Sequence, residues 1–133
     1  MKNPYQGMAK LLLIDDDDIT NFTVEAILSR AVTVESYEIK SNGWDALEFL
    51  NTCHRQNRFP DLIFVDLNMP EMDGFEFIER YEATFYKLYQ QTKVSVLSSS
   101  VSEKDRQRSL AYYCVSEYTY KPLTEEKLDK IIQ

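Results

Sequence analysis

The stretch KLLLIDDDDIT, residues 10–20, places a run of apolar residues directly before four consecutive aspartates. A short, continuous apolar run such as KLLLI (10–14) is typical of a parallel strand that is buried on both faces. Neighbouring carboxylates repel one another by about 1 kcal/mol per pair in water at 4 Å, and by more near a protein surface. The aspartates that end this strand therefore need compensation, for which a bound cation, a helix N-terminus and plain solvation are the candidates.

The same change from short apolar runs to helical spacing recurs along the chain. Further strands are predicted over VESYEIK (34–40), DLIFVDL (61–67), KVSVLS (93–98) and SEYTY (116–120), and the first of these is polar enough for a sheet edge. Helical spacing predicts intervening helices over about 19–30, 43–54, 75–91, from 102 onward, and 124–132. Strands that alternate with helices predict an α/β fold with a parallel sheet covered on both faces, whose ligand crevice lies at the carboxyl ends of the strands.

Three of these helices carry apolar residues at helical spacing, which we expect to face the sheet. The residues are Ile19, Phe22, Ala26 and Ile27 in the first helix, Trp44, Leu47 and Leu50 in the second, and Phe75, Ile78, Tyr81 or Glu82, Phe85 and Leu88 in the third. Ser102 and Thr124 are predicted N-caps, and Asp105 is expected to complete a capping box with Ser102.

Composition narrows the class of protein. A length of 133 residues fits one domain with a real core, and 44% hydrophobic with 28% charged residues is ordinary for a globular chain. The net charge of −7 argues against nonspecific nucleic-acid binding and against anionic membranes, and fits a cation site or basic protein partners. No apolar run reaches the roughly 18 residues of a membrane span, and MKNPYQGMAK lacks a signal-peptide core. We expect a cytoplasmic protein in which Cys53 and Cys114 are reduced and buried.

Polar side chains follow four of the predicted strands, where they would meet at one crevice. They are Asp15 and Asp16 after the first strand, Asp66 after the third, Ser98 at the end of the fourth, and Lys121, followed by Pro122, after the fifth. Carboxylate oxygens suit Mg²⁺, a carboxylate can act as a nucleophile, and a lysine and a hydroxyl can neutralise phosphoryl oxygens. Asp66 is the best candidate nucleophile, because it stands alone at the end of the central strand opposite the acidic pair.

These features resemble the receiver domain of two-component response regulators. The resemblance covers about residues 10–132 and rests on the acidic pair, the DLNMPEMDG loop (66–74), the hydroxyl after the fourth strand and KP at 121–122. It implies a three-layer, flavodoxin-like (βα)5 fold over residues 10–133, with a parallel five-stranded sheet in the order 2-1-3-4-5. Residues 1–9 would form an N-terminal extension.

The resemblance also implies a function. The chain would be a stand-alone phosphorelay protein that takes a phosphoryl group from a sensor histidine kinase or a histidine phosphotransfer protein. It would not be an enzyme beyond its own phosphorylation and dephosphorylation, and would contact neither nucleic acid nor membrane. Its output would be altered binding to an unknown downstream protein, through the face formed by the fourth helix, fifth strand and fifth helix.

For the metal and the nucleophile, the resemblance implies one role for each residue. Asp66 would accept the phosphoryl group and also contact Mg²⁺. Asp16 would bind Mg²⁺ directly, Asp15 would bind it mainly through water, and Asn68 would contribute its backbone carbonyl. The side chain of Asn68 would remain free to influence the access of water.

For the phosphorylated state, the resemblance implies a switch. Ser98 would hydrogen-bond the phosphoryl group, and Lys121 would pair with one of its oxygens. The peptide bond between Lys121 and Pro122 would be cis. Tyr118 would be the switch aromatic that turns inward when Ser98 moves, although a plain packing role is the alternative.

Other residues that draw attention have simpler interpretations. Asp17 and Asp18 fit capping of the helix that follows better than metal contact. Asp73 with Gly74 fits a turn and helix start, and His54 fits a residue near a helix end. Cys114 stands where receivers usually carry a glycine, so the fourth helix either ends differently or carries strain of roughly 1 kcal/mol.

One enzyme class competes with the receiver interpretation. The segment DDDIT (16–20) also fits the D-x-D-x-T signature of haloacid-dehalogenase-type phosphatases, with Asp16 as nucleophile and Asp18 as acid–base. That family usually needs a longer chain and a late acidic pair, and it leaves Asp66 without a role. A receiver-like adaptor that no longer takes phosphate is a third class, but every expected site residue is present.

Overall fold

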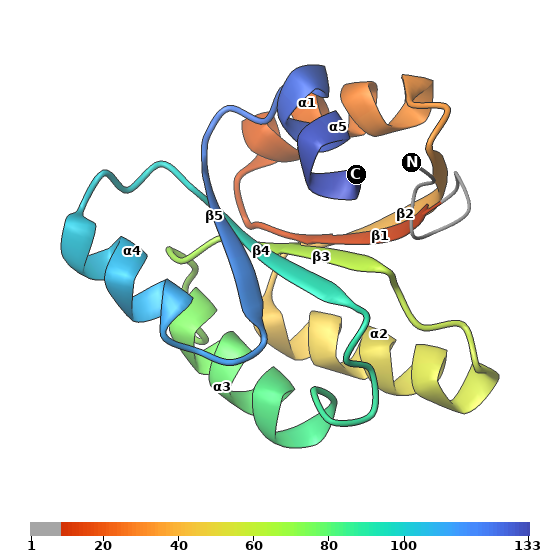
Figure 1. Cartoon of the computed structure of the whole chain (residues 1–133), viewed down its shortest axis with the longest axis vertical. Coiled ribbons are helices and arrows are strands. Elements are labelled where there is room, and N and C mark those ends of the chain that lie inside the picture. Colours follow the sequence, from red (N-terminus) through yellow and green to blue (C-terminus); the bar gives the residue numbers. More distant parts are fainter. Residues whose placement is uncertain (1–8) are drawn as a thin grey trace.

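A computed structural model describes residues 9–133, in which five strands alternate with five helices (Figure 1). The strands are β1 (Ala9–Ile14), β2 (Val34–Lys40), β3 (Leu62–Val65), β4 (Lys93–Ser98) and β5 (Val115–Tyr120). The helices are α1 (Asp18–Arg30), α2 (Gly43–Gln56), α3 (Gly74–Thr84), α4 (Glu103–Leu110) and α5 (Glu125–Ile132). Residues 1–8 of the expected N-terminal extension lie outside the described residues, and Ala9 already belongs to β1. Between residues 9 and 133, every helix is too short or too polar to cross a bilayer.

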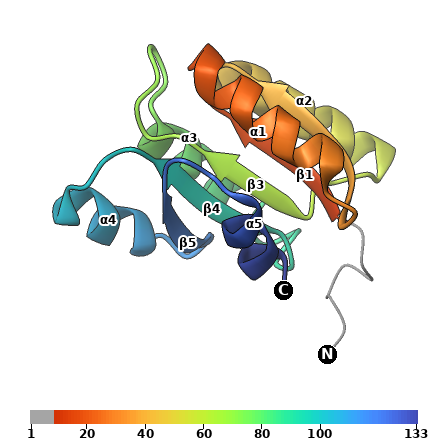
Figure 2. The same cartoon turned by 90° about the horizontal axis from the view of Figure 1, so that it is seen from above.

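The five strands form one parallel sheet in the order β2-β1-β3-β4-β5. Helices α1 and α5 cover one face, and α2, α3 and α4 lie on the other (Figures 1 and 2). The predicted α/β class, the three-layer flavodoxin-like arrangement and the strand order are therefore confirmed. The polar strand β2 lies at a sheet edge, as its composition indicates.

Each face of the sheet has its own apolar core, because successive side chains of a strand point to opposite faces. In β1, Leu11 and Leu13 join the cluster under α1 and α5, whereas Leu12 and Ile14 join the cluster under α2 and α3. For this reason β3 is apolar at every position and β1 at every position except Lys10, and burial on both faces fixes these two strands in the interior of the sheet.

Four helix starts follow the predicted chemistry, each with a side-chain oxygen that accepts a backbone N–H of the first turn. These N-caps are Asp17 for α1, Asp73 for α3, Ser102 for α4 and Thr124 for α5. Cys53 and Cys114 are both free and buried, also as expected.

The capping box at α4 is only half formed. The backbone N–H of Asp105 donates to Ser102 Oγ at 3.2 Å, as predicted. The Asp105 carboxylate does not return to the Ser102 N–H, because it accepts the Ser100 hydroxyl at 2.8 Å. The Ser102 N–H donates instead to Ser100 Oγ at 3.2 Å, so Ser100 replaces the expected reciprocal contact.

The predicted inward faces of the first two helices are partly wrong. Ile27 of α1 is buried as predicted, but Ile19 and Phe22 are 76% and 77% exposed, and Val24 and Leu28 are buried in their place. Both sets recur at helical spacing, so only the docking of α1 on the sheet decides between them. In α2, Leu50 is buried, but Trp44 is half exposed, with the Arg80 guanidinium 4.6 Å from its ring centroid.

The third helix is shorter than predicted. It ends at Thr84, with Phe85 as C-cap, and the chain continues to residue 92 in turns instead of reaching Gln91 as a helix. Phe59 stacks on Tyr89 with ring centroids 3.6 Å apart, and Tyr89 hydrogen-bonds His54 of α2. These contacts favour the turn, which leads the chain into β4, and they leave Leu88 exposed.

The backbone at Cys114 carries no left-handed strain. Among residues 9–133, the non-glycine positions with positive φ are Asn57 and Glu71, so Cys114 does not adopt a left-handed conformation. Helix α4 ends at Ala111 in a right-handed conformation, and the Cys114 N–H donates to the carboxylate of Glu82 at 2.8 Å. The fourth helix therefore ends differently from one closed by a left-handed glycine.

Candidate functional site

The register of the sheet brings the predicted site residues to one edge. Ile14 pairs with Val65 across β1 and β3, so the residues that follow, Asp15 and Asp66, lie beside each other. The Asp66 N–H donates to the carbonyl of Ile14 at 2.9 Å, which ties the two strand ends together. These strands are neighbours at the centre of the sheet (Figure 2). The carboxylates consequently emerge at the carboxyl edge, as the sequence predicts.

Three carboxylates form the centre of the site. Asp15, Asp16 and Asp66 each offer an oxygen, and these oxygens lie within 4.8 Å of one another. Asp15 is fully buried and Asp66 is 4% exposed, whereas Asp16 is open to solvent. Two buried carboxylates and an exposed third therefore form a negative cluster that contacts solvent through Asp16.

Lys121 supplies the compensating positive charge. The Lys121 N–H donates to the carbonyl of Ser98 at 2.9 Å, which fixes the backbone after β5. Its Nζ then lies 2.8 Å from Asp15 Oδ2 and 3.6 Å from Asp66 Oδ1. Burial acts to lower the pKa of Lys121, but its contacts with Asp15 and Asp66 outweigh burial, so the pKa is raised and the ammonium is retained.

The environment of Asp66 disfavours its charged form. Burial is the main cause, and the negative charge of Asp15 adds to it, while Lys121 opposes both. Together they raise the pKa of Asp66 to about 6. Asp66 is therefore mostly ionised at neutral pH, but its negative charge is poorly compensated by the protein alone.

The donor set suits a hard divalent cation. Asp15 Oδ1 accepts the N–H of Asp17 at 2.9 Å, whereas its buried Oδ2 meets the Lys121 ammonium without hydrogen-bond geometry. Asp16 offers an exposed carboxylate beside these buried groups. Mg²⁺ prefers carboxylate oxygens and retains several waters, so a cluster that is open on one side fits it.

The four consecutive aspartates divide their tasks. Asp15 and Asp16 belong to the carboxylate cluster, whereas Asp17 caps α1 by accepting the N–H groups of Ile19 and Thr20. A hydrogen bond from the Thr20 hydroxyl is the main reason why the pKa of Asp17 is lowered. Asp18 is the exposed first residue of α1. The capping interpretation is confirmed for Asp17, and Asp18 lies in the first turn, where a negative charge is favourable.

The loop between β3 and α3 is held tightly against the nucleophile candidate. A Cβ atom at Gly74 would lie 2.3 Å from the carbonyl oxygen of Asp66, so only glycine fits this approach. Within the loop, the side chain of Asn68 is exposed, and Glu71 adopts φ of 66°, which costs a non-glycine residue roughly 1 kcal/mol. The sequence marked Gly74 as a helix start, but nothing in it signalled this backbone contact.

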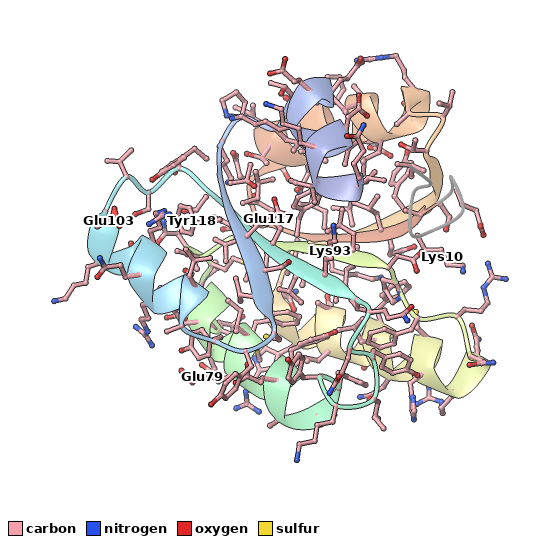
Figure 3. The ribbon with its side chains drawn as sticks, viewed as in Figure 1. Lys10, Glu79, Lys93, Glu103, Glu117 and Tyr118 are labelled. Carbon is pink, nitrogen blue, oxygen red and sulfur yellow. The ribbon has the colours of Figure 1, made fainter. Side chains whose placement is uncertain are left out.

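The remaining site residues lie at the ends of β4 and β5. Ser98 is fully buried, and its Oγ accepts the N–H of Ser100 at 3.0 Å. Tyr118 is half buried and donates its hydroxyl to the carbonyl of Ser100 at 2.9 Å. Figure 3 shows Tyr118 on the α4 side of β5. The peptide bond from Lys121 to Pro122 is cis.

Ser100 is the residue that sequence reasoning missed. It stands in the run Ser98–Ser100, where three identical side chains give no local signal of which one makes long-range contacts. Asp18, which the phosphatase interpretation needs as acid–base, is not part of the carboxylate cluster.

Comparison with solved structures identifies close structural relatives. A two-component response regulator from Cytophaga hutchinsonii superposes with a TM-score of 0.85 at 34% identity, covering 92% of each chain. The Mn²⁺-bound form of response regulator Rcp1 superposes with a TM-score of 0.72 at 28% identity, covering 94% of this chain and 89% of that one.

Sequence comparison points the same way. The sensor histidine kinase CheAY of Helicobacter pylori is 31% identical over 93 residues, which is 70% of this chain and 11% of the kinase. The chain spans less than half the length of the curated relatives that it matches. The model of the response regulator receiver domain matches residues 11–133. The chain therefore belongs to the response regulator receiver domain family of two-component signalling.

Proposed function

We propose that this chain is a Mg²⁺-dependent phosphoacceptor of a phosphorelay, with Asp66 as the residue that receives the phosphoryl group. The observation that carries the proposal is the position of Asp66: it is a buried carboxylate, clustered with Asp15 and Asp16, with the Lys121 ammonium 3.6 Å away. Membership of the receiver domain family supports it.

Phosphoryl transfer requires the chain mainly to position the reacting groups and to neutralise charge. An Asp66 carboxylate oxygen attacks the phosphorus of a phosphohistidine, a new P–O bond forms, and the P–N bond breaks. The electron pair of that bond leaves with the imidazole, which takes up a proton. Lys121 pairs with a phosphoryl oxygen, and the Ser98 hydroxyl donates a hydrogen bond to another. The outcome is an acyl phosphate on Asp66.

The same residues would hold the cation. Asp15, Asp16 and Asp66 supply carboxylate oxygens, and Asn68 is proposed to add its backbone carbonyl. When bound, Mg²⁺ would neutralise negative charge on the phosphoryl oxygens. The composition of the cluster and the Mn²⁺-bound form of Rcp1 support this assignment.

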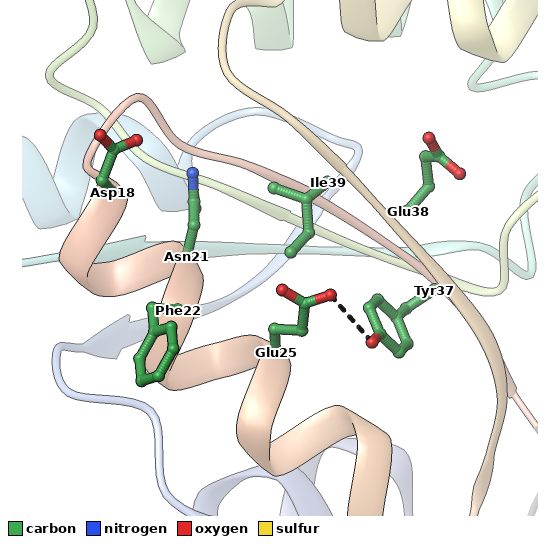
Figure 4. A pocket seen from close by; sticks show the side chains of 7 residues that line it. All are labelled: Asp18, Asn21, Phe22, Glu25, Tyr37, Glu38 and Ile39. Atoms are coloured by element: carbon green, nitrogen blue, oxygen red, sulfur yellow. Dashed lines mark hydrogen bonds between the residues drawn. The ribbon is translucent and has the colours of Figure 1, made fainter.

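The phosphodonor is proposed to be a histidine kinase or phosphotransfer protein that docks on α1. A groove between α1 and β2 is lined by Asp18, Asn21, Phe22, Glu25, Tyr37, Glu38 and Ile39 (Figure 4). Its three carboxylates favour a basic side chain, and Tyr37 donates its hydroxyl to Glu25 at 3.1 Å. The exposed side chains of Phe22 and Ile19 provide apolar contact next to the acidic cluster.

The output surface is proposed to be the face of α4, β5 and α5. Four large apolar or aromatic side chains are exposed on or beside α4 and β5, namely Val101, Leu110, Tyr113 and Tyr120. The ring of Tyr120 packs edge-on against Tyr118, with ring centroids 5.3 Å apart. A change in Tyr118 would therefore reach this surface directly, where a downstream protein can bind.

Acetyl phosphate with Mg²⁺ and intact mass spectrometry test the phosphoacceptor assignment. We expect one acid-stable, base-labile phosphoryl adduct on the unmodified chain and none on Asp66→Asn. Asp18→Asn is the matched control: it should keep the adduct, because Asp18 lies outside the cluster, whereas a haloacid-dehalogenase-type phosphatase would need it. Repeated turnover of a phosphoester, lost in Asp16→Asn and Asp18→Asn, would contradict the proposal.

The donor site is tested separately. Phe22→Ala should slow phosphoryl transfer from a histidine kinase while leaving uptake from acetyl phosphate unchanged, because only the protein donor needs the docking surface. Val32→Ala, which alters an 88% exposed side chain just beyond the other end of α1, is the control and should behave as the unmodified chain. Equal rates of phosphoryl transfer from the kinase to both variants would show that the donor does not dock at Phe22.

A further inference from the structure

Ser100 connects three parts of the molecule through one residue. Its N–H donates to Ser98 Oγ at 3.0 Å, and its carbonyl accepts the Tyr118 hydroxyl at 2.9 Å. Its own hydroxyl donates to Asp105 Oδ2 at 2.8 Å and accepts the N–H of Ser102 at 3.2 Å. Ser100 thus uses its backbone donor, its backbone acceptor and both functions of its side chain.

These bonds fall into two groups. Within residues 9–133, the side chain of Ser100 binds only the start of α4, through Ser102 and Asp105. In the same part of the chain, its backbone binds only the candidate switch, through Ser98 and Tyr118. The side-chain contacts therefore fix the backbone that contacts the switch. The neighbouring Ser99 is exposed, and its side chain makes no hydrogen bond within residues 9–133, so this geometry belongs to Ser100 and not to the serine run.

We infer that Ser100 is a positioning residue that couples Ser98, Tyr118 and the start of α4 into one unit. The inference rests on the proposed function, and it adds a residue to that mechanism. Because Ser98 Oγ accepts the Ser100 N–H, the Ser98 hydroxyl hydrogen is left free to donate to a phosphoryl group on Asp66. Because the Ser100 carbonyl accepts the Tyr118 hydroxyl, the orientation of the ring is tied to the loop that the side chain of Ser100 anchors to α4.

The coupling predicts a specific consequence for Ser100→Ala. This variant loses both contacts with α4 but keeps the backbone groups, so the loop can move away from Ser98 and Tyr118. With acetyl phosphate and saturating Mg²⁺, we expect adduct formation to slow by about fivefold, the equivalent of one hydrogen bond. Affinity for Mg²⁺ should not change, because no part of Ser100 belongs to the carboxylate cluster.

Three variants serve as controls. Ser99→Ala removes an exposed hydroxyl next door and should react as the unmodified chain. Ser100→Thr keeps the hydroxyl and should restore the rate. Asp105→Asn keeps an oxygen that accepts the Ser100 hydroxyl, so it should react much faster than Ser100→Ala.

Amide hydrogen exchange by NMR separates positioning from a loss of overall stability. In Ser100→Ala, the amides of Ser100 and Ser102 should exchange faster, while those of β3 remain as protected as before. Equal reaction rates and equal exchange in Ser100→Ala and Ser99→Ala would overturn the inference. A uniform rise in exchange over the whole sheet would also overturn it, because it would show only a structural role. If the unmodified chain takes no phosphoryl group, the proposed function fails, but the exchange comparison still decides whether Ser100 holds the loop.

Discussion

At the scale of single residues, the candidate site is a balance between burial and charge. The charge of Asp66 is poorly compensated in its buried position, and Lys121 cannot offset this alone because it lies closer to Asp15, at 2.8 Å rather than 3.6 Å. The pKa of Asp66, raised to about 6, records this imbalance. A bound cation would relieve it.

This imbalance predicts a pH-dependent effect of Asp66→Asn on stability in the absence of divalent cations. The folded chain holds the proton of Asp66 up to a pH of about 6, whereas the unfolded chain releases it near 3.9, so stability is lost as pH rises through this window. Asparagine carries no such penalty. With chelator present, we expect the variant to be more stable by about 1–3 kcal/mol at pH 7.5 and by less at pH 5.

Urea unfolding at the two pH values measures this difference. If the difference in free energy of unfolding between Asp66→Asn and the unmodified chain stays constant from pH 5 to pH 7.5, the charge of Asp66 does not destabilise the fold, and the prediction is contradicted. Addition of Mg²⁺ at pH 7.5 should reverse the order, because the cation binds the carboxylate and not the amide.

The close approach of Gly74 to the backbone of Asp66 leads to a second prediction for a single residue. A methyl group at this position would lie 2.3 Å from the backbone oxygen of Asp66, and backbone cannot move aside as a flexible side chain can. We expect Gly74→Ala to destabilise the fold by about 1–3 kcal/mol and to slow phosphoryl uptake, since Asp66 must shift. Gly43→Ala is the matched control, because there the methyl group would meet the flexible side chain of Met72. Equal losses in both variants would remove the special role of Gly74.

At the scale of elements, helix α1 shows how four adjacent aspartates are accommodated. Asp17 carries the cap, so Asp17→Ala should lower the urea midpoint of unfolding, and Asp17→Asn, which keeps an acceptor oxygen, should lower it less. Because the pKa of Asp17 is lowered, the stabilisation that its carboxylate gives to α1 should be present at neutral pH and be lost in acid. Asp18→Ala should change the midpoint less than Asp17→Ala, and the opposite order would contradict the capping assignment.

The elements also show which parts of the fold can be predicted from the sequence. Strands were predictable because short apolar runs between polar segments, as in β1 and β3, suit a strand buried on both faces better than a helix. The buried face of α1 could not be predicted, since Phe22 and Val24 both fit helical spacing and only packing on the sheet separates them. The end of α3 could not be predicted either, because no proline or glycine follows Thr84 directly and the end of the helix depends on contacts of Tyr89 with distant residues.

The candidate site divides in the same way. The positions of Asp15, Asp66, Ser98 and Lys121 follow from strand ends, which the order of strands places at one edge. The contacts of Ser100 do not follow from the strand ends, because they depend on the path of the β4–α4 loop and on the orientation of Asp105. Local sequence determines neither of them.

At the scale of the whole molecule, the sheet order links the site to a distant surface. β1 and β3 at the centre carry the carboxylates, while β4 and β5 carry Ser98 and Lys121 toward the edge next to α4. Tyr118 belongs to β5, and its hydroxyl donates to the carbonyl of Ser100 in the β4–α4 loop. A charge change at Asp66 therefore has a continuous set of contacts to the face of α4 and β5.

The position of the phosphoryl group can be located by chemistry. After reaction with acetyl phosphate and Mg²⁺, borohydride reduces an acyl phosphate of aspartate to homoserine, which peptide mapping by mass spectrometry can place. We expect homoserine at position 66 and nowhere else in the chain. Homoserine at position 16, or no reduced residue in a chain that has taken up phosphate, would contradict the assignment of Asp66 as the phosphoacceptor.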